Sequence, residues 1–225
     1  NNRGLNIEKI ILNSFGRGVN LLSKNHLDKN FTILKLEKNR INISLFKNKS
    51  FVFTEDFNFG LNLIFTDISK LCSLKIEEVE KFMKEVELKS LIENNDDLDL
   101  EKKHFYISPY RKIKYTLILN IMTARLEELF EVCYKKNTNI KNLRINDKVY
   151  IYIDFPDYFK NLQYILEKSK ITTLECTYND STDQNRLSAL AGGCELIGKG
   201  WEKEAIPVTD KKKSFISGFF SKLFS

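Results

Sequence analysis

The sequence predicts a mixed fold, α/β or α+β, with strands both before and between helices. Residues 31–36, 41–46 and 51–54 carry apolar side chains in strand-like runs, and a polar turn separates the last two runs. This pattern is typical of a three-stranded β-meander. From Leu63 onward the apolar residues recur at intervals of three and four, which predicts helices. A further strand over residues 148–154 then interrupts the helical pattern.

The helices are predicted as follows. After Ser73, apolar residues at helical spacing continue to Val86. Ser108 and Pro109 are typical of a helix N-cap and first turn, so we expect a long helix from there to Cys133. Beyond the strand at 148–154 we expect a helix over 158–168, a short strand over 172–176 and a small-residue helix over 187–196.

Composition places the chain among globular proteins, with 225 residues, 42% hydrophobic and 29% charged. No apolar run is long enough to cross a bilayer, since even residues 115–122 contain Thr116 and Asn120. The chain begins at Asn1, and we expect a fragment or a processed chain without a signal peptide. Four irregularly spaced cysteines and two histidines predict neither a metal site nor a disulfide framework, and we expect His26 and His104 to be exposed.

The last residues are apolar on one side only. As a helix, residues 214–225 would bring six apolar side chains onto one continuous face: Phe215, Ile216, Phe219, Phe220, Leu223 and Phe224. Basic residues accompany this face, namely Lys211, Lys212, Lys213 and Lys222. Aromatic rings beside a lysine run are typical of a helix that lies on an anionic membrane. The alternative is a terminal helix that docks on its own domain.

Six segments resemble, in order and over nearly the whole chain, the second half of the bacterial cell-division protein FtsA, an actin-like family. They are residues 4–11, 57–60 with Asp67 and Ile68, 74–81, 123–131, 187–193 and the basic, aromatic tail. The resemblance implies an α/β, actin-like (ribonuclease H-like) subdomain formed by residues 1–66 and 136–205. It further implies an outer, partner-binding subdomain at residues 67–135, a linker at 206–213 and a membrane-targeting helix at 214–225.

The chain departs from the family where nucleotide would bind. The family's glycine-rich phosphate hairpin is replaced here by a segment that includes Lys35, Glu37, Lys38 and Asn39. Without glycines the backbone N–H groups cannot approach phosphates closely, and Glu37 would repel them. Gly60 and Asp67 match the turn and helix that follow the hairpin, but residues 153–157 lack the glycines of the adenosine-side loop. We therefore expect no catalytic residues, no metal, no cofactor and no ATPase activity in this chain, and ATP binding by the intact protein stays open.

The resemblance also implies partners and a location. The partners would be the C-terminal tail of the tubulin-like division protein FtsZ, anionic membrane lipid and further copies of the protein. By position, Arg111, Lys112 and Arg125 are the candidates to contact acidic groups of that tail. For Arg125 an ion pair with Glu128 or another nearby acid is an equal alternative. The location would be the cytoplasmic face of the bacterial cell membrane, at the division septum.

Two other functions stay open as alternatives: an actin-like ATPase of the pilus-assembly or cell-shape type, and a peripheral membrane protein that acts through its tail alone. Residues 193–200 approach a phosphate-loop pattern but lack its final Ser or Thr, so we expect a closely packed helix there. The tyrosines near residues 150–164 lack the glycine and aromatic signature of an RNA-binding sheet, and we expect no nucleic acid.

Overall fold

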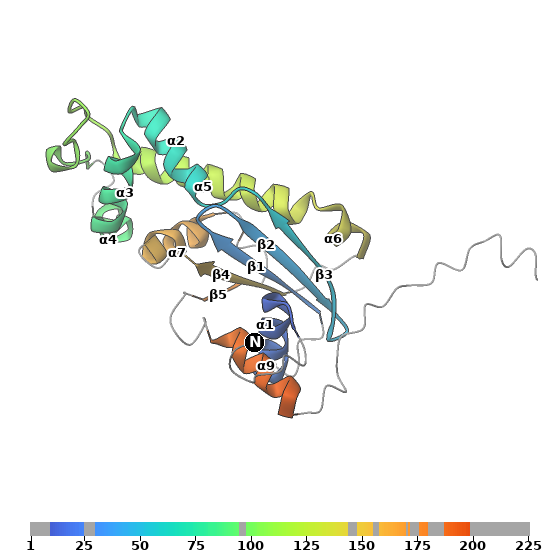
Figure 1. Cartoon of the computed structure of the whole chain (residues 1–225). Coiled ribbons are helices and arrows are strands. Elements are labelled where there is room, and N and C mark those ends of the chain that lie inside the picture. The colour runs from blue at the N-terminus through green and yellow to red at the C-terminus, as the bar shows by residue number, and fades with distance from the viewer. Residues whose placement is uncertain are drawn as a thin grey trace, which may run out of the picture.

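The structure is a computed structural model, and it describes residues 10–24, 30–94, 98–143, 148–154, 158–169, 171, 176–179 and 187–198. Figure 1 shows a central sheet with helices on both sides. The elements are α1 (Asn13–Lys24), β1 (Phe31–Glu37), β2 (Ile41–Lys47), β3 (Ser50–Phe57), α2 (Asn62–Cys72), α3 (Ile76–Glu85), α4 (Leu88–Asn94), η1 (Lys102–His104), α5 (Tyr115–Phe130), η2 (Glu131–Lys135), α6 (Thr138–Leu143), β4 (Lys148–Asp154), α7 (Phe159–Lys168), β5 (Cys176–Asn179) and α9 (Ser188–Gly198).

The sheet has five strands in the order β3-β2-β1-β4-β5. The first three strands pair antiparallel, whereas β4 lies parallel to β1 and β5 lies parallel to β4. The antiparallel half is the predicted meander, joined by short turns. The parallel half requires longer crossovers, which α2 to α6 and then α7 provide.

Alternate residues of the strands face two different layers. On one face, Phe31 and Ile33 of β1 join Tyr150 and Tyr152 of β4 in a small core next to α1. On the other face, Leu34 and Leu36 belong to the main core, which also includes residues of α5 and α7. Because both faces are covered, the central strands β1 and β4 are buried on both sides.

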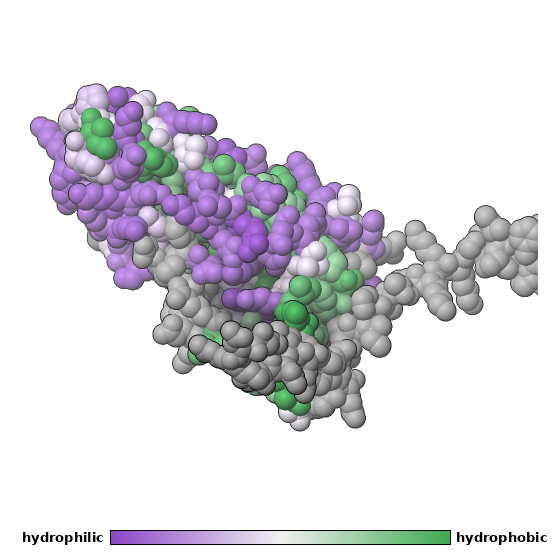
Figure 2. Space-filling view, viewed as in Figure 1, coloured by the Kyte–Doolittle hydropathy of each residue, from purple (hydrophilic) through white to green (hydrophobic). Residues whose placement is uncertain are grey.

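The helices between β3 and β4 extend outward from the sheet, and α5 runs back along its face (Figure 1). One continuous core joins them to the sheet, from Ile43 of β2 to Val79, Phe82 and Ile118 of the helices. The outer surface of this helical region is largely hydrophilic (Figure 2). The predicted boundaries of an outer subdomain at 67–135 stay a prediction.

On the opposite face of the sheet, α1 and α9 pack closely against each other. A Cβ atom at Gly192 would lie 1.8 Å from the carbonyl oxygen of Gly16, and one at Gly16 would lie 2.5 Å from the oxygen of Ala189. Only glycine allows the two backbones to approach this closely. The predicted small-residue helix is thus present, and it packs closely as expected.

Three predictions about local structure need correction. The long helix does not begin at Ser108: α5 begins at Tyr115, and a π-helical turn (η2) follows it. The short strand lies at Cys176–Asn179, later than expected. His104 is buried, with 2% of its surface exposed, and it packs against the ring of Phe82; His26 lies outside the described residues. Within the described part of the chain, no helix has the length and apolar character of a membrane span.

Candidate functional site

The segment that replaces the phosphate hairpin forms the turn between β1 and β2. The N–H of Glu37 donates to the carbonyl of Arg40 and closes the turn. The first N–H groups of α2 then donate to the turn: Leu61 to the carbonyl of Glu37 at 3.0 Å, and Asn62 to that of Lys38 at 2.9 Å. A helix N-terminus is a common anion site, but here its donors already bind protein.

Gly60 has a clear role in this arrangement. A Cβ atom at this position would lie 2.5 Å from the carbonyl oxygen of Glu37 and 2.6 Å from the nitrogen of Arg40. The close contact between the turn and the start of α2 therefore requires glycine. The matched glycine therefore lets the start of α2 pack against the hairpin.

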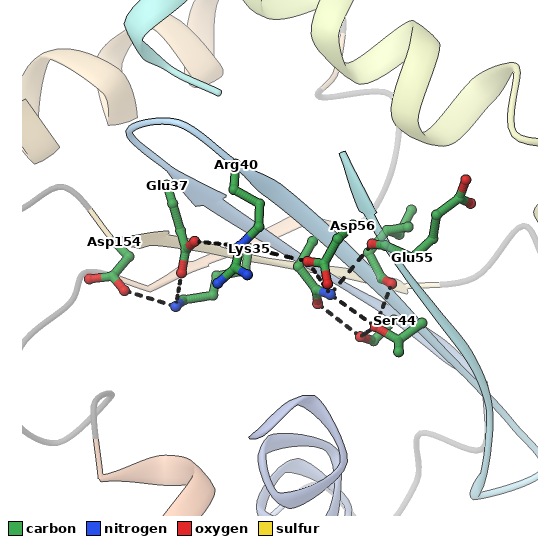
Figure 3. Close-up of polar contacts among 10 residues, drawn as sticks. Lys35, Glu37, Arg40, Ser44, Glu55, Asp56 and Asp154 are labelled. Carbon is green, nitrogen blue, oxygen red and sulfur yellow. Dashed lines mark hydrogen bonds and ion pairs between the residues drawn. The ribbon is translucent and has the colours of Figure 1, made fainter. Parts of the chain in front are cut away.

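The charged side chains around the turn pair with one another (Figure 3). Lys35 contacts both Glu37 and Asp154, the latter at 2.9 Å across the β1–β4 pair. Arg40 contacts Glu37 at 3.0 Å and Asp56 at 3.7 Å. Burial alone would raise the pKa of Glu37, but the contacts with Lys35 and Arg40 outweigh it and lower that pKa. The hairpin thus holds balanced charges.

The turn is also tied to the helical region. Lys38 at its tip contacts Glu80 of α3 at 2.9 Å, and Asn39 is exposed beside it. The cations Lys35 and Lys38, which could have bound phosphate, are therefore both engaged with carboxylates. A ligand would have to displace these ion pairs.

A polar cleft of about 190 Å³ lies between this hairpin and the start of α1. Its wall includes Arg17, which is only 7% exposed. The Arg17 Nε donates to Asn13 at 3.0 Å, and its guanidinium lies 5.0 Å from the ring centre of Tyr152. Burial lowers the pKa of Arg17. Electrostatic interactions with Tyr152, Asp154 and Glu37 raise this pKa and so partly offset the effect of burial. The cleft lies beside the hairpin, and most of its lining side chains are polar.

A second cleft, of about 380 Å³, lies between the end of α3 and the start of α7. Asn161 holds its floor in place: its side chain donates to the carbonyls of Met83 and Val86 and accepts from the N–H of Leu88. Glu87 and Lys160 form an ion pair at its rim. Tyr158, Lys160 and Asn161 line this cleft, and in the sequence they come directly after the expected adenosine-side loop at 153–157. Residues 155–157 of that loop lie outside the described part of the chain.

Residues 101–114 form a compact loop at the outer end of the helical region, here called the basic loop. Its base is closed by backbone hydrogen bonds from Leu100 to Ile113 and from Tyr115 to Leu98. Its middle is fixed by Glu78 of α3, whose carboxylate accepts from the N–H groups of Ile107 and Ser108 at 2.7 and 2.8 Å. A surface loop with joined ends and fixed interior is a common site of function.

Glu78 is fully buried and accepts two further hydrogen bonds, from the Ser108 hydroxyl at 2.5 Å and from the Lys75 N–H at 2.9 Å. Burial alone would raise the pKa of this carboxyl, but the bonds from Ser108, Ile107 and Lys75 lower it to about 2. Ser108 also accepts from the N–H of Lys75 at the start of α3. The capping residues therefore serve α3, which explains why no helix begins at Ser108.

The basic loop presents rings and cations to solvent. Tyr106, Ile107 and Tyr110 are exposed apolar residues, and the predicted contacts Arg111 and Lys112 are exposed beside them. Two lysines lie over the rings, Lys81 over Tyr106 at 4.8 Å and Lys102 over Tyr110 at 5.2 Å. This surface can contact an acidic segment that also carries an apolar side chain.

Arg125 lies apart from this loop, on α5. Its side chain is 27% exposed and contacts Asp67 of α2 and Glu128 of α5, the latter at 2.7 Å. The contact with Asp67 raises the pKa of Arg125. The alternative of an ion pair is thus present in the structure, and partner binding by Arg125 stays a prediction. Asp67 is engaged here and not at the hairpin.

Other predicted groups are placed as follows. All the predicted membrane-binding residues, from Lys211 to Phe224, lie outside the described residues. Tyr150, Tyr152, Tyr158 and Tyr164 are buried and so offer no stacking surface to bases. Among the described residues, no group of three or more His, Cys, Asp or Glu side chains could hold a metal ion.

Comparisons with known proteins identify the fold. Neither a protein-family model nor a curated protein matches the sequence. Among solved structures, the chain is similar to the ethanolamine utilization protein EutJ from Carboxydothermus hydrogenoformans, to MreB5 of Spiroplasma citri bound to ADP and to the PilM–PilN type IV pilus biogenesis complex, each with a TM-score of 0.50. The chain has an actin-like fold.

The likeness covers 80%, 89% and 87% of this chain but only 52%, 64% and 54% of those chains, at 12%, 12% and 11% identity. The chain therefore spans about half to two thirds of their length. At such identities the likeness shows the fold alone. The expected actin-like fold is confirmed, while the family stays a proposal.

Several residues of this actin-like chain were not found from sequence. Arg17 could have been suspected from its spacing of four from Asn13, but its burial depends on β4. Glu78 carries a signal, since a Glu at the third position of a helix is typical of a capping box. Asn161 gives no signal, because its three partners lie more than 70 positions earlier in the chain.

Proposed function

We propose that this chain is part of an adaptor that links the filament-forming division protein FtsZ to the cytoplasmic face of the membrane, as its resemblance to FtsA implies. The basic loop, residues 101–114, carries this proposal. It is closed at its base, fixed by Glu78 and lined with exposed rings and cations. Such a surface suits a short acidic and hydrophobic tail, because preformed loops lose little entropy on binding.

The proposal assigns no catalysis to this chain. The hairpin lacks glycines, its cations pair with carboxylates, and the N–H groups at the start of α2 bind the hairpin itself. Each of these features removes a group that would otherwise stabilise charge on phosphate. Self-association through actin-like contacts and a tail on anionic lipid would make the adaptor multivalent.

A tail-peptide titration tests the adaptor function. A labelled peptide with the C-terminal tail sequence of FtsZ should bind the chain weakly and less well at higher salt. The double variant Arg111→Glu, Lys112→Glu should weaken binding at least about tenfold, because it replaces two cations by two acids beside the exposed rings.

The matched control is Lys135→Glu, Lys141→Glu, which makes the same change of charge at exposed positions near the far end of α5. This control variant should weaken binding of the peptide only slightly. Equal losses in the two double variants would mean that net charge and not the basic loop governs binding, and absence of binding by the unaltered chain would remove the proposed function.

Nucleotide binding without hydrolysis is the second candidate, favoured by the polar cleft beside the hairpin with its buried Arg17. MreB5, one of the structural neighbours, was bound to ADP. Calorimetric titration of the chain with ADP and ATP measures binding, and a phosphate-release assay measures turnover. Sustained phosphate release by the purified chain would overturn the assignment as a non-catalytic adaptor.

A further inference from the structure

Helix α9 is apolar on two sides, although the structure covers only one of them. Its inner side, with Gly192 and Leu196, is buried, and Gly192 contacts α1. Its outer side carries Leu190 and Ile197, and Leu187 lies directly before the helix; 65%, 65% and 54% of their surfaces are exposed. An apolar stripe on a helix normally faces a packing partner.

The outer side forms one continuous stripe, here called the α9 stripe. Its members recur at intervals of three and four and carry no charge: Leu187, Leu190, Ala191, Cys194, Ile197 and Gly198. Three of its side chains are large, those of Leu187, Leu190 and Ile197, and the residues between or beside them on the stripe are small: Ala191, Cys194 and Gly198. A second helix with bulky side chains fits such a surface by packing its ridges over the small residues.

We propose that the tail helix of this same chain, residues 214–225, docks on the α9 stripe when no membrane is present. As a helix, the tail would carry large apolar side chains, of Phe, Ile and Leu, in pairs at intervals of four, bulky groups that suit a surface with small residues. The α9 stripe is about 16 Å long, and residues 199–213 can span up to about 50 Å when extended. The tail can therefore fold back along α9 without strain.

Tethering favours the chain's own tail over other occupants. A segment joined by a short linker has an effective concentration of about 1 mM at its site, far above the concentration of a second copy in a dilute solution. The contact is apolar on both sides, so it requires no ion pair. Burying the six apolar side chains of the tail would stabilise its helix, which is too short to persist alone.

The docked tail would compete with lipid for the same apolar face. The docking depends only on α9 and the tail sequence, whereas its consequence for membranes rests on the proposed function. An anionic membrane would favour release of the tail from α9, because lysines 211–213 are attracted to anionic lipid headgroups. The uncharged α9 stripe offers these lysines no such attraction. Membrane binding would then be coupled to exposure of α9.

Cross-linking tests the docking directly. Cys194 lies on the stripe, and Ser217→Cys places a second thiol at the border of the tail's apolar face. A short bismaleimide should join the two within one chain, at a yield independent of protein concentration, and Cys194→Ser should abolish the product. Products that join two chains would assign the stripe to a second copy and overturn the proposal, as would a lack of any product.

Vesicle cosedimentation tests the competition. Leu190→Gln, Ile197→Gln should raise affinity for anionic vesicles at least about threefold, since the apparent Kd varies inversely with the fraction of accessible tail. The control Leu71→Gln, Leu117→Gln removes exposed apolar residues elsewhere and should leave affinity unchanged. Equal affinities in the two variants would overturn the competition. If no variant binds vesicles while the cross-link forms, the membrane function fails and the docking stands.

Discussion

At the scale of single residues, Glu78 decides whether the basic loop is fixed. We expect Glu78→Gln to lower the free energy of unfolding by about 1.5–3 kcal/mol at pH 7, because the amide presents an N–H group to donors that need an acceptor. The unfolded carboxyl titrates near 4.5 and the folded one near 2. Since the folded pKa is the lower one, this stabilisation is complete above about pH 5 and is lost as the pH falls from 4.5 toward 2.

Urea denaturation at pH 7 and pH 3 measures the effect. The difference between the original chain and Glu78→Gln should shrink at the lower pH. Glu77→Gln is the control, because Glu77 is an exposed neighbour in the same turn of α3. A difference that does not change with pH would show that the hydrogen bonds of Glu78 contribute little to stability.

Arg125 separates a structural role from a partner-binding role. We expect Arg125→Glu to destabilise the fold by about 1–3 kcal/mol, because it sets a third carboxylate beside Asp67 and Glu128. The added change Asp67→Arg should restore part of the loss by reversing the pair. Thermal unfolding measures both. If Arg125→Glu unfolds at the original temperature yet no longer binds the FtsZ tail peptide, Arg125 is a partner contact instead.

Residue types near the hairpin could be predicted from sequence, but their pairing could not. The missing glycines and the presence of Lys35 and Glu37 are visible in the chain itself. The contact of Lys35 with Asp154 depends on the parallel register of β1 and β4, where Glu37 lies opposite Asp154. The register between strands that are distant in sequence depends on packing throughout the core. The ion pairs of the hairpin could therefore not be predicted from the sequence.

At the scale of elements, the crossing of α1 and α9 depends on glycine. We expect Gly192→Ala to lower the free energy of unfolding by about 1–3 kcal/mol, because its methyl group would overlap the backbone of Gly16. Gly193→Ala is the matched control in the same helix, since a Cβ there would make only an ordinary contact, 3.4 Å from the Cδ1 of Ile11. Chemical denaturation compares the two. Equal stabilities would mean that the helices separate at little cost.

Elements with strong local patterns were predicted well, and errors came from contacts distant in sequence. The strands at 31–37, 41–47 and 148–154 alternate or are apolar throughout, as strands in a covered sheet require. The helix expected at Ser108 failed because Ser108 and Glu78, 30 positions apart, cap α3 together. His104 is buried for a similar reason, since η1 folds it against Phe82 of α3.

At the scale of the whole chain, the fold is actin-like, but the hairpin lacks the glycines that would let backbone N–H groups approach phosphate. The hairpin pairs its own charges, and Gly16, Gly60 and Gly192 serve close packing. A fold by itself does not set a function, which depends on the sites that the fold carries. The two surfaces with proposed roles belong to the basic loop, at the outer end of the helical region, and to α9, on the other side of the sheet (Figure 1).

The basic, aromatic tail, residues 211–225, is the segment through which we propose that the whole chain binds the membrane. We expect residues 211–225, as a synthetic peptide, to be largely unfolded in water and to become helical on anionic vesicles, where burial of its apolar face outweighs the cost of helix nucleation.

In the full chain, Phe219→Glu, Phe220→Glu should abolish vesicle binding, because it places two charges on the face that enters the acyl region. Lys→Gln changes at 211, 212 and 213 should weaken binding mainly to anionic lipid and mainly at low salt, since each lysine contributes about 1 kcal/mol there. Circular dichroism and cosedimentation measure these effects. Retention of the Phe219→Glu, Phe220→Glu chain on vesicles at the original level would show that another part of the protein is the anchor.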